Sequence, residues 1–263
     1  MTQRAPLLAE DIEACLRPGP PGWRIRIFRE TASTNDIVDR AGRGGEPAGF
    51  VAFAETQTAG RGRMGRSWDS RPGLGLWFSA LVRPPWPASQ AGRLTIAAAV
   101  AVAEAASAAG VPATIKWPND VLSRDRKLAG ILTELRCSGD QIDYAVVGIG
   151  VNVLHGPADF PPDLIVPATS LAMECPRPPR REQLAADILN RLATNIADEF
   201  GPVRLRWIRL CSTLGRTIEL RNAPEPVRGV AESIDDSGAL ILRDGAGNLR
   251  AIHAGDVIHQ EPT

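Results

Sequence analysis

The sequence predicts an α+β (mixed α/β) main domain followed by a small β-barrel, on three observations. Extended and helical segments alternate without a regular β-α-β order over residues 1–212, so a doubly wound sheet is not expected. The Ala-rich run 94–111 has the composition of a buried helix. After residue 213, short apolar segments are separated by tight-turn residues. We therefore expect a main domain over 1–212 and a barrel over 213–263.

Apolar or alternating runs define the strands expected in the main domain, at 23–28, 50–55, 74–83, 113–118, 128–136 and 142–153. Ser33 and its neighbours are good helix-capping residues and predict a short helix over 33–42. The Ala-rich helix should end near Gly110 and Pro112. A second, amphipathic helix is predicted over 181–200, because apolar residues recur at a spacing of four.

Less regular segments make up the rest of the chain. Proline and glycine dominate 155–180 without any period, which predicts a surface connection. The barrel strands are expected at 216–220, 227–234, 239–243 and 249–253, with turns between them.

Composition limits the classes of function. Lys plus Arg equals Asp plus Glu, 30 against 30, so no overall charge attracts nucleic acid or an anionic membrane. Any bound anion must be held by a local arrangement. The four cysteines form no C-x-x-C pair, and we expect free thiols in a reducing cytoplasm. Early acidic residues argue against a secretion signal, and Glu104 interrupts the Ala-rich run, so no membrane span is expected.

Arginine and glycine alternate in the stretch Q-T-A-G-R-G-R-M-G-R-S-W, residues 57–68. Glycine lets backbone N–H groups face a ligand, and arginine adds charge and forked donors, so the stretch suits a phosphate. It is not a P-loop, and its G-x-G-x-x-G pattern lacks the strand-to-helix context of a dinucleotide site. A solvated basic loop is the alternative.

Three further motifs follow. In 116-KWPND-120, Lys116 suits phosphate oxygens and Asp120 suits Mg²⁺, the alternative being an ordinary turn. In 127-KLAGIL-132, Lys127 precedes an apolar strand, and the alternative is that it reaches solvent. In 148-GIGVN-152, glycines allow a close approach, either of a ligand or of a packed helix.

The chain resembles the biotin protein ligase (holocarboxylase synthetase) family in the combination and order of five motifs. They are S-T-N at 33–35, the Gly/Arg run, KWPND, KLAGIL and GIGVN. The resemblance covers roughly residues 23–263. It implies a class II synthetase-like catalytic domain with an SH3-like β-barrel. It also implies a two-step reaction. Biotin and ATP, with Mg²⁺, give biotinyl-5′-AMP and pyrophosphate, and biotin then passes to a lysine of a biotin carboxyl carrier protein.

The resemblance further implies roles for individual residues. The residues matched to biotin binding are Ser33, Thr34, Asn35, Gln57, Arg61, Gly62, Arg63, Lys127 and Gly130. Those matched to ATP and the adenylate are Arg61, Arg63, Arg66, Trp68, Lys116, Gly148 and Asn152. The catalytic set is Lys127, Arg63, Lys116 and Asp120, with Lys127 between the biotin carboxylate and the phosphate and Asp120 beside a metal.

Some expectations concern departures from the family. Met64 stands where many relatives carry arginine. The S-T-N motif begins at residue 33, which leaves no room for the N-terminal DNA-binding domain of some relatives, so we expect no DNA binding. Some relatives form homodimers, and the resemblance leaves the oligomeric state open. We also predict that residues 58–68 are poorly ordered without ligand and close over the adenylate.

Three other functions are the alternatives to a biotin ligase. A lipoate– or octanoate–protein ligase shares the fold and acyl-adenylate chemistry, but usually lacks the full Gly/Arg run. A nucleic-acid-binding protein would need aromatics among the arginines, and only Trp68 is there. A protein that merely binds biotin would not need Lys116, Asp120 and Lys127 together.

Overall fold

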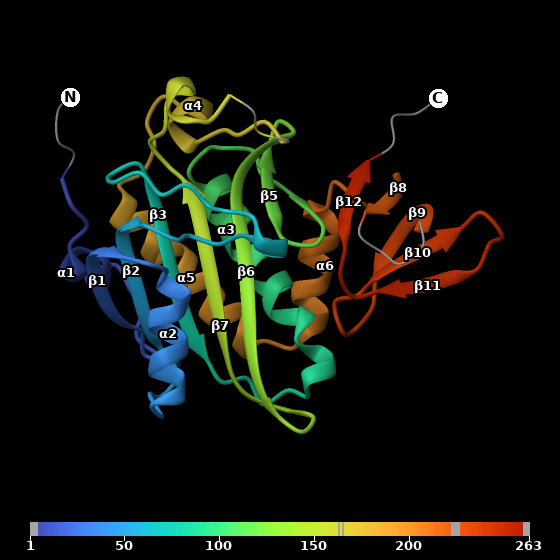
Figure 1. Cartoon of the computed structure of the whole chain (residues 1–263), viewed down its shortest axis with the longest axis horizontal. Coiled ribbons are helices and arrows are strands. Elements are labelled where there is room, and N and C mark those ends of the chain that lie inside the picture. The colour runs from blue at the N-terminus through green and yellow to red at the C-terminus, as the bar shows by residue number, and fades with distance from the viewer. Residues whose placement is uncertain (1–4, 163, 165, 222–226, 260–263) are drawn as a thin grey trace.

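The computed structural model describes residues 5–162, 164, 166–221 and 227–259. Its main body is a seven-stranded mixed sheet in the order β1-β2-β3-β7-β6-β5-β4 (Figure 1). β1 and β2 run parallel, and each of the other neighbouring pairs is antiparallel. The strands are β1 Arg24–Thr31, β2 Phe50–Gln57, β3 Gly75–Val82, β4 Thr114–Lys116, β5 Asp120–Ser123, β6 Arg126–Ser138 and β7 Gln141–Asn152.

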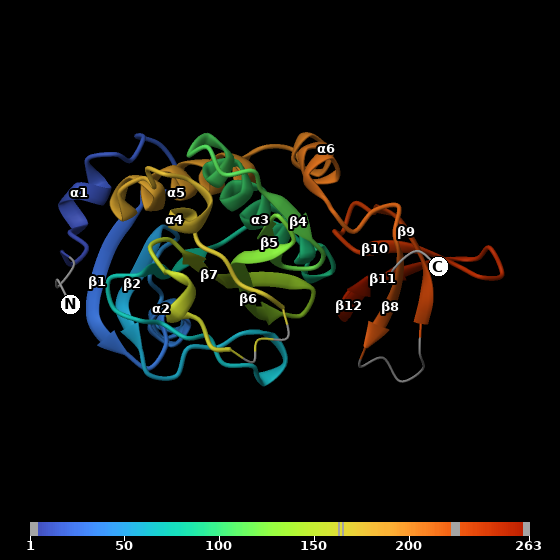
Figure 2. The ribbon, with the colours of Figure 1, turned by 90° about the horizontal axis from the view of Figure 1, so that it is seen from above.

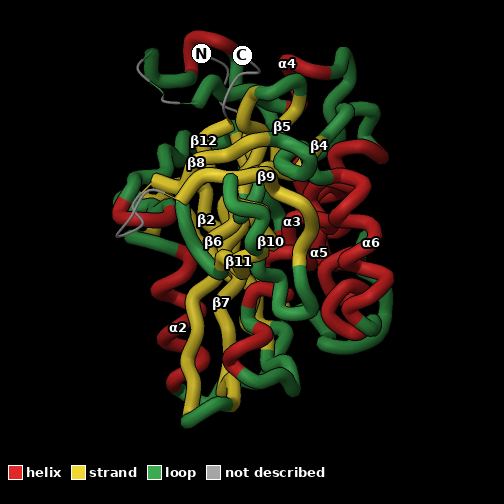
Figure 3. The backbone as a smooth tube through the Cα atoms, turned by 90° about the vertical axis from the view of Figure 1, so that its right-hand side faces the viewer, coloured by secondary structure: helices red, strands yellow, loops and turns green. Residues whose placement is uncertain are grey.

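Helices cover both faces of this sheet, but unequally. They are α1 Ala9–Glu13, α2 Thr34–Arg43, α3 Gly92–Ala108, α4 Leu171–Glu174, α5 Arg181–Ala197 and α6 Phe200–Leu210. Figures 2 and 3 show α3, α5 and α6 gathered on one face, with α2 on the opposite face. The α2 face is therefore only partly covered, and residues 58–68, the Gly/Arg loop, cross it (Figure 2).

The Ala-rich segment is the central helix of the core, as predicted. By length and composition Ala88–Ala108 could cross a membrane, but 61% of the relevant window is buried inside the protein. Small alanine side chains let α3 pack closely against α5, α6 and the sheet. All eight residues of β3 are buried because this central strand has covered faces on both sides.

The C-terminal barrel consists of β8 Thr217–Arg221, β9 Val227–Ile234, β10 Leu240–Asp244, β11 Leu249–Ile252 and β12 Asp256–His259. These strands form an antiparallel sheet in the order β11-β10-β9-β8-β12. It lies beside α6, next to the end of the large sheet that holds β5 (Figure 1). A domain boundary at residue 213 remains a prediction.

The predicted strands and helices are present with shifts of a few residues, but several elements were missed. β5 has four residues, too few for a visible pattern, and α6 contains Gly201 and Pro202, which suggest a helix end. α1 and β12 are also short. The expectation for 155–180 was wrong in part, because Thr169, Ser170 and Leu171 are fully buried. The four cysteines are free thiols.

Candidate active site

A cavity of about 540 Å³ lies on the α2 face of the large sheet. The predicted site residues found in its described lining are Ser33, Thr34, Asn35, Gln57, Arg61, Gly62, Arg63, Arg66, Trp68, Asp120, Lys127, Gly130, Gly148 and Asn152. Lys116 is absent from that lining, but pairs in register with Asp120 on the adjacent strand. The motifs, which span more than a hundred positions of the sequence, therefore converge on one site.

The amino-terminal end of α2 forms one end of the cavity. Ser33 occupies the N-cap position. The Gln57 side-chain oxygen accepts hydrogen bonds from the Thr34 amide at 2.8 Å and from the Thr34 hydroxyl at 3.1 Å. The Thr34 and Ser79 hydroxyls lie 2.7 Å apart, and the Gln57 amide donates to Ser70 at 3.2 Å. These polar groups are held in place before any ligand arrives.

Asn35 is also held by its neighbours. Its Oδ1 accepts from the Ser79 hydroxyl, and its Nδ2 donates to Glu134 Oε2 at 2.8 Å. Any Cβ at Gly148 would collide with Asn35 Oδ1. Here the close approach predicted at Gly148 is made by a side chain of α2. The sequence patterns did not point to Glu134, which lies in the middle of an apolar strand.

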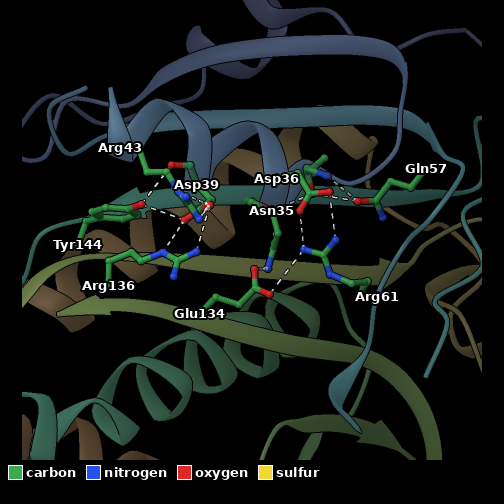
Figure 4. A network of polar contacts seen from close by, with 11 residues as sticks. Asn35, Asp36, Asp39, Arg43, Gln57, Arg61, Glu134, Arg136 and Tyr144 are labelled. Atoms are coloured by element: carbon green, nitrogen blue, oxygen red, sulfur yellow. Dashed lines mark hydrogen bonds and ion pairs between the residues drawn. The ribbon is translucent and has the colours of Figure 1, made fainter. Parts of the chain in front are cut away.

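Arg61 anchors the start of the Gly/Arg loop. It donates two hydrogen bonds to Asp36, at 2.7 and 3.1 Å, and lies 3.5 Å from Glu134 (Figure 4). The hydrogen bond with Asp36 raises the pKa of Arg61 above its ordinary value. Its charge is therefore already compensated by two carboxylates, on α2 and β6.

Arg63 and Arg66 anchor the other end of the loop. Arg63 donates to Asn119 Oδ1 at 3.2 Å and to the Gly255 carbonyl at 3.4 Å. Burial lowers the pKa of Arg63, although nearby carboxylates oppose this. Arg66 binds Asp256 Oδ1 at 2.9 Å. The loop itself is a small hairpin closed by a bond from the Gly62 amide to the Arg66 carbonyl. Disorder of the free loop remains a prediction.

Lys127 and Trp68 form the floor beneath the loop. Lys127 Nζ lies 2.7 Å from Asp120 Oδ1 and 5.4 Å from the centre of the Trp68 ring. A Cβ at Gly130 or Gly150 would come within 2.9 or 2.6 Å of the Trp68 ring. Because these glycines have no side chains, the Trp68 indole can pack directly against the backbone of the sheet.

Lys116 adds a second amine close to this floor. Burial lowers its pKa, the Asp120 carboxylate opposes that change, and the charge of Lys127 reinforces it. Asp120 thus interacts electrostatically with three cations: Lys116, Lys127 and Arg63. These three cations lie near two carboxylates, Asp120 and Asp256, and this local surplus of positive charge favours a polyphosphate ligand.

The segment after β7 closes the remaining side. Asn152 Nδ2 donates to the carbonyls of Thr169 and Lys127, at 3.0 and 3.3 Å, and so holds this segment against β6. His155 and Phe160 stack with ring centres 5.0 Å apart and line the cavity. No sequence pattern pointed to either ring, because the segment has no period.

The described lining of the cavity has few side chains of the kind that bind Mg²⁺. Among the described residues, no group of three or more His, Cys, Asp or Glu side chains is placed to hold a metal ion. Asp120 lines the cavity beside the lysines, and Asp69 and Asp159 also belong to its lining. Mg²⁺ commonly binds one or two carboxylates together with substrate phosphates and water, so Asp120 fits a nucleotide-bound Mg²⁺.

Comparisons with known proteins give consistent matches. Residues 27–152 match the biotin/lipoate A/B protein ligase family, and residues 213–260 match the biotin protein ligase C-terminal domain. The biotin–[acetyl-CoA-carboxylase] ligase of Mycobacterium tuberculosis is 36% identical over 267 residues, which cover 97% of each chain. The bifunctional ligase/repressor BirA of Bacillus subtilis is 36% identical over 95% of this chain and 78% of its own length.

A solved structure shares the fold. The biotin protein ligase of Aquifex aeolicus in complex with biotin and ATP superposes with a TM-score of 0.74 at 26% identity. The match covers 90% of this chain and 98% of that chain. The class II synthetase-like fold with a small C-terminal β domain, expected from the sequence, is therefore confirmed.

Proposed function

Because this chain belongs to the biotin protein ligase family, we infer that it is an ATP-dependent ligase that makes biotinyl-5′-AMP and transfers biotin to a protein lysine. The observation that supports this function best is the convergence of Lys127, Arg63 and the end of α2 on one cavity. At about 540 Å³ the cavity lies within the usual range for small-molecule sites. The lipoate and nucleic-acid alternatives are not favoured.

We propose the following roles for the first step. A biotin carboxylate oxygen attacks the α-phosphorus of ATP, a new P–O bond forms, and the bond to pyrophosphate breaks. Both reactants are anions, so their repulsion must be cancelled by fixed cations. Lys127 exchanges its contact with Asp120 for the reacting carboxylate and phosphate. Lys116 binds the phosphates. Arg61, Gly62, Arg63 and Arg66 form the loop that covers the ligand, in which Arg63 holds the adenylate after it has formed.

Further contacts orient biotin and adenosine. The Thr34–Gln57 network and Asn35 present polar groups to the ring system of biotin. Trp68, together with the segment held by Asn152, lies where the nucleoside would bind. Orientation of two reactants in this way lowers the barrier without any protein nucleophile.

In the second step, the amine of the acceptor lysine attacks the biotinyl carbonyl of the mixed anhydride. An amide bond forms, the bond to the AMP oxygen breaks, and the amine loses a proton. Closure of the Gly/Arg loop over the anhydride excludes water until the lysine arrives.

Asp120 would hold the Mg²⁺ that accompanies ATP, and the ion would neutralise charge on the phosphates. The acceptor proposed is a biotin carboxyl carrier domain of acetyl-CoA carboxylase, by analogy with the name of the Mycobacterium tuberculosis relative. Homodimer formation and DNA binding form no part of this proposal.

The direct test uses the purified full chain with Mg·ATP and one acid at a time: biotin, lipoate or octanoate. Mass spectrometry then identifies the acyl-AMP formed. Biotinyl-AMP alone is the expected product. Lipoyl- or octanoyl-AMP would preserve the chemistry but overturn the substrate, and the lack of any adenylate would overturn the function.

A further inference from the structure

The C-terminal barrel reaches the Gly/Arg loop through the turn between β11 and β12. Two neighbouring residues make the contacts: Gly255 in the turn, and Asp256, the first residue of β12. The Gly255 carbonyl accepts a hydrogen bond from Arg63, and Asp256 Oδ1 accepts one from Arg66 at 2.9 Å. Residues about 190 positions apart in the sequence are thus joined at the mouth of the cavity.

The barrel is a fixed support for this contact, because a second turn docks it on the main domain. Arg93 of α3 donates to the Asp236 carbonyl at 2.6 Å, and Arg204 of α6 donates to the Ile234 carbonyl at 2.7 Å. The backbones of Gly92 and Gly238 also touch, since a Cβ at Gly238 would lie 2.9 Å from the Gly92 carbonyl carbon. The position of Asp256 therefore does not depend on the loop.

The loop consequently spans the cavity between two acidic anchors. On the α2 side, Arg61 binds Asp36 and Glu134. On the barrel side, Arg66 binds Asp256, while Arg66 Nε also donates to the Arg63 carbonyl. One contact with the barrel thus holds both the side chain of Arg66 and the backbone turn that carries Arg63.

We propose that Asp256 is a positioning residue that holds the Gly/Arg loop closed over the cavity through Arg66. This inference rests on the proposed function, because it assigns the barrel a part in retaining biotinyl-AMP. Asp256 acts on the loop and does not contact the reacting atoms. Loss of its charge releases one anchor while the Arg61 anchor remains.

The test compares wild type with Asp256→Asn and a matched control, Glu232→Gln, which removes another barrel carboxylate that pairs with an arginine, Arg243. Hydrogen exchange of the Gly62 and Trp68 amides is measured with synthetic biotinyl-AMP bound, the state in which the loop is expected to be closed, because both amides bond within the loop. Because an ion pair that is partly exposed to solvent contributes little, exchange in Asp256→Asn should rise by about 1.4- to five-fold. The control should match wild type.

A second readout is the rate at which pre-formed biotinyl-AMP leaves the enzyme, which should rise by a similar factor in Asp256→Asn. The exchanged pair Arg66→Asp with Asp256→Arg should restore slow amide exchange, which a general loss of barrel structure would not allow. Unchanged exchange, or slower release of the adenylate from Asp256→Asn, would overturn the inference. If wild type makes no biotinyl-AMP from biotin and Mg·ATP, the proposed function fails, and amide exchange with added biotinyl-AMP still decides whether Asp256 holds the loop.

Discussion

Lys127 and Asp120 lie on neighbouring strands, β6 and β5, with Nζ 2.7 Å from Oδ1 at the wall of the cavity. Each side chain is mostly screened from solvent. The carboxylate holds the amine in place before any substrate binds, and an incoming anion can take its place. The pair is therefore suited to the proposed reaction between two anions.

Substitution Lys127→Ala should severely impair adenylation. If Lys127 stabilises developing charge as an oxyanion donor does, the loss is about 2.7–4 kcal/mol, or roughly 10²–10³-fold in rate. Pyrophosphate release with biotin and Mg·ATP measures this step. Arg136→Ala, on the same strand but outside the cavity lining, is the control. Full activity of Lys127→Ala would refute the assignment.

Substitution Arg63→Ala should let the adenylate escape while leaving its synthesis largely intact. A hydrogen bond to a charged group contributes about 1.5–3 kcal/mol, which corresponds to roughly ten- to a hundred-fold faster release. Gel filtration after a single turnover gives the ratio of free to bound biotinyl-AMP. If the adenylate stays with the variant as it does with wild type, Arg63 does not retain it.

A buried ion pair behind the cavity predicts a large effect on stability. Arg181 Nη1 lies 2.9 Å from Glu55 Oε2, and both side chains are at most 10% exposed. Burial would raise the pKa of Glu55, but its bonds with Arg181 and with the Leu7 and Gly73 amides lower it overall.

Arg181→Met would leave Glu55 buried and unpaired, so the free energy of unfolding should fall by about 3–5 kcal/mol. Urea denaturation measures the change. Adding Glu55→Gln to Arg181→Met should recover part of the loss, because no charge is then left unpaired. A loss no larger than that of a typical surface substitution would contradict this account.

Acid stability should depend on Asp39, in the middle of α2 (Figure 4). Burial works against its charge, but hydrogen bonds from Arg136, Tyr144 and Arg43 lower its pKa from 3.8 to about 2. Because the pKa is lower in the folded state, this contribution to stability is present above pH 3.8 and is lost as the pH falls through about 2.

Asp39→Asn should therefore be less stable than wild type near neutral pH, and the difference should shrink as the pH falls from 3.8 toward 2. Thermal unfolding at a series of pH values, at constant ionic strength, tests the prediction. A difference in stability that does not change over this interval would show that the carboxylate charge is not responsible.

The sequence alone predicted which residues gather at the candidate site and most of the framework around it. The Gly/Arg run, KWPND and KLAGIL pointed to an anion site, and all of the predicted residues except Lys116 line the cavity. The alanine-rich composition of α3 was enough to place it in the core. Such patterns can be recognised in a sequence because they depend on residues that are only a few positions apart.

Only the tertiary structure decided which groups complete the site. Glu134 and Asp256 bind the loop arginines. In the sequence, neither can be distinguished from an ordinary solvent-exposed acidic residue of a strand. Gly130 and Gly150 accommodate Trp68, which the sequence could not distinguish from close contact with a ligand. β5 and the stacked rings of His155 and Phe160 left no local pattern. These contacts depend on how distant segments of the chain pack together, and the periodicity of one segment does not predict which other segments it will contact.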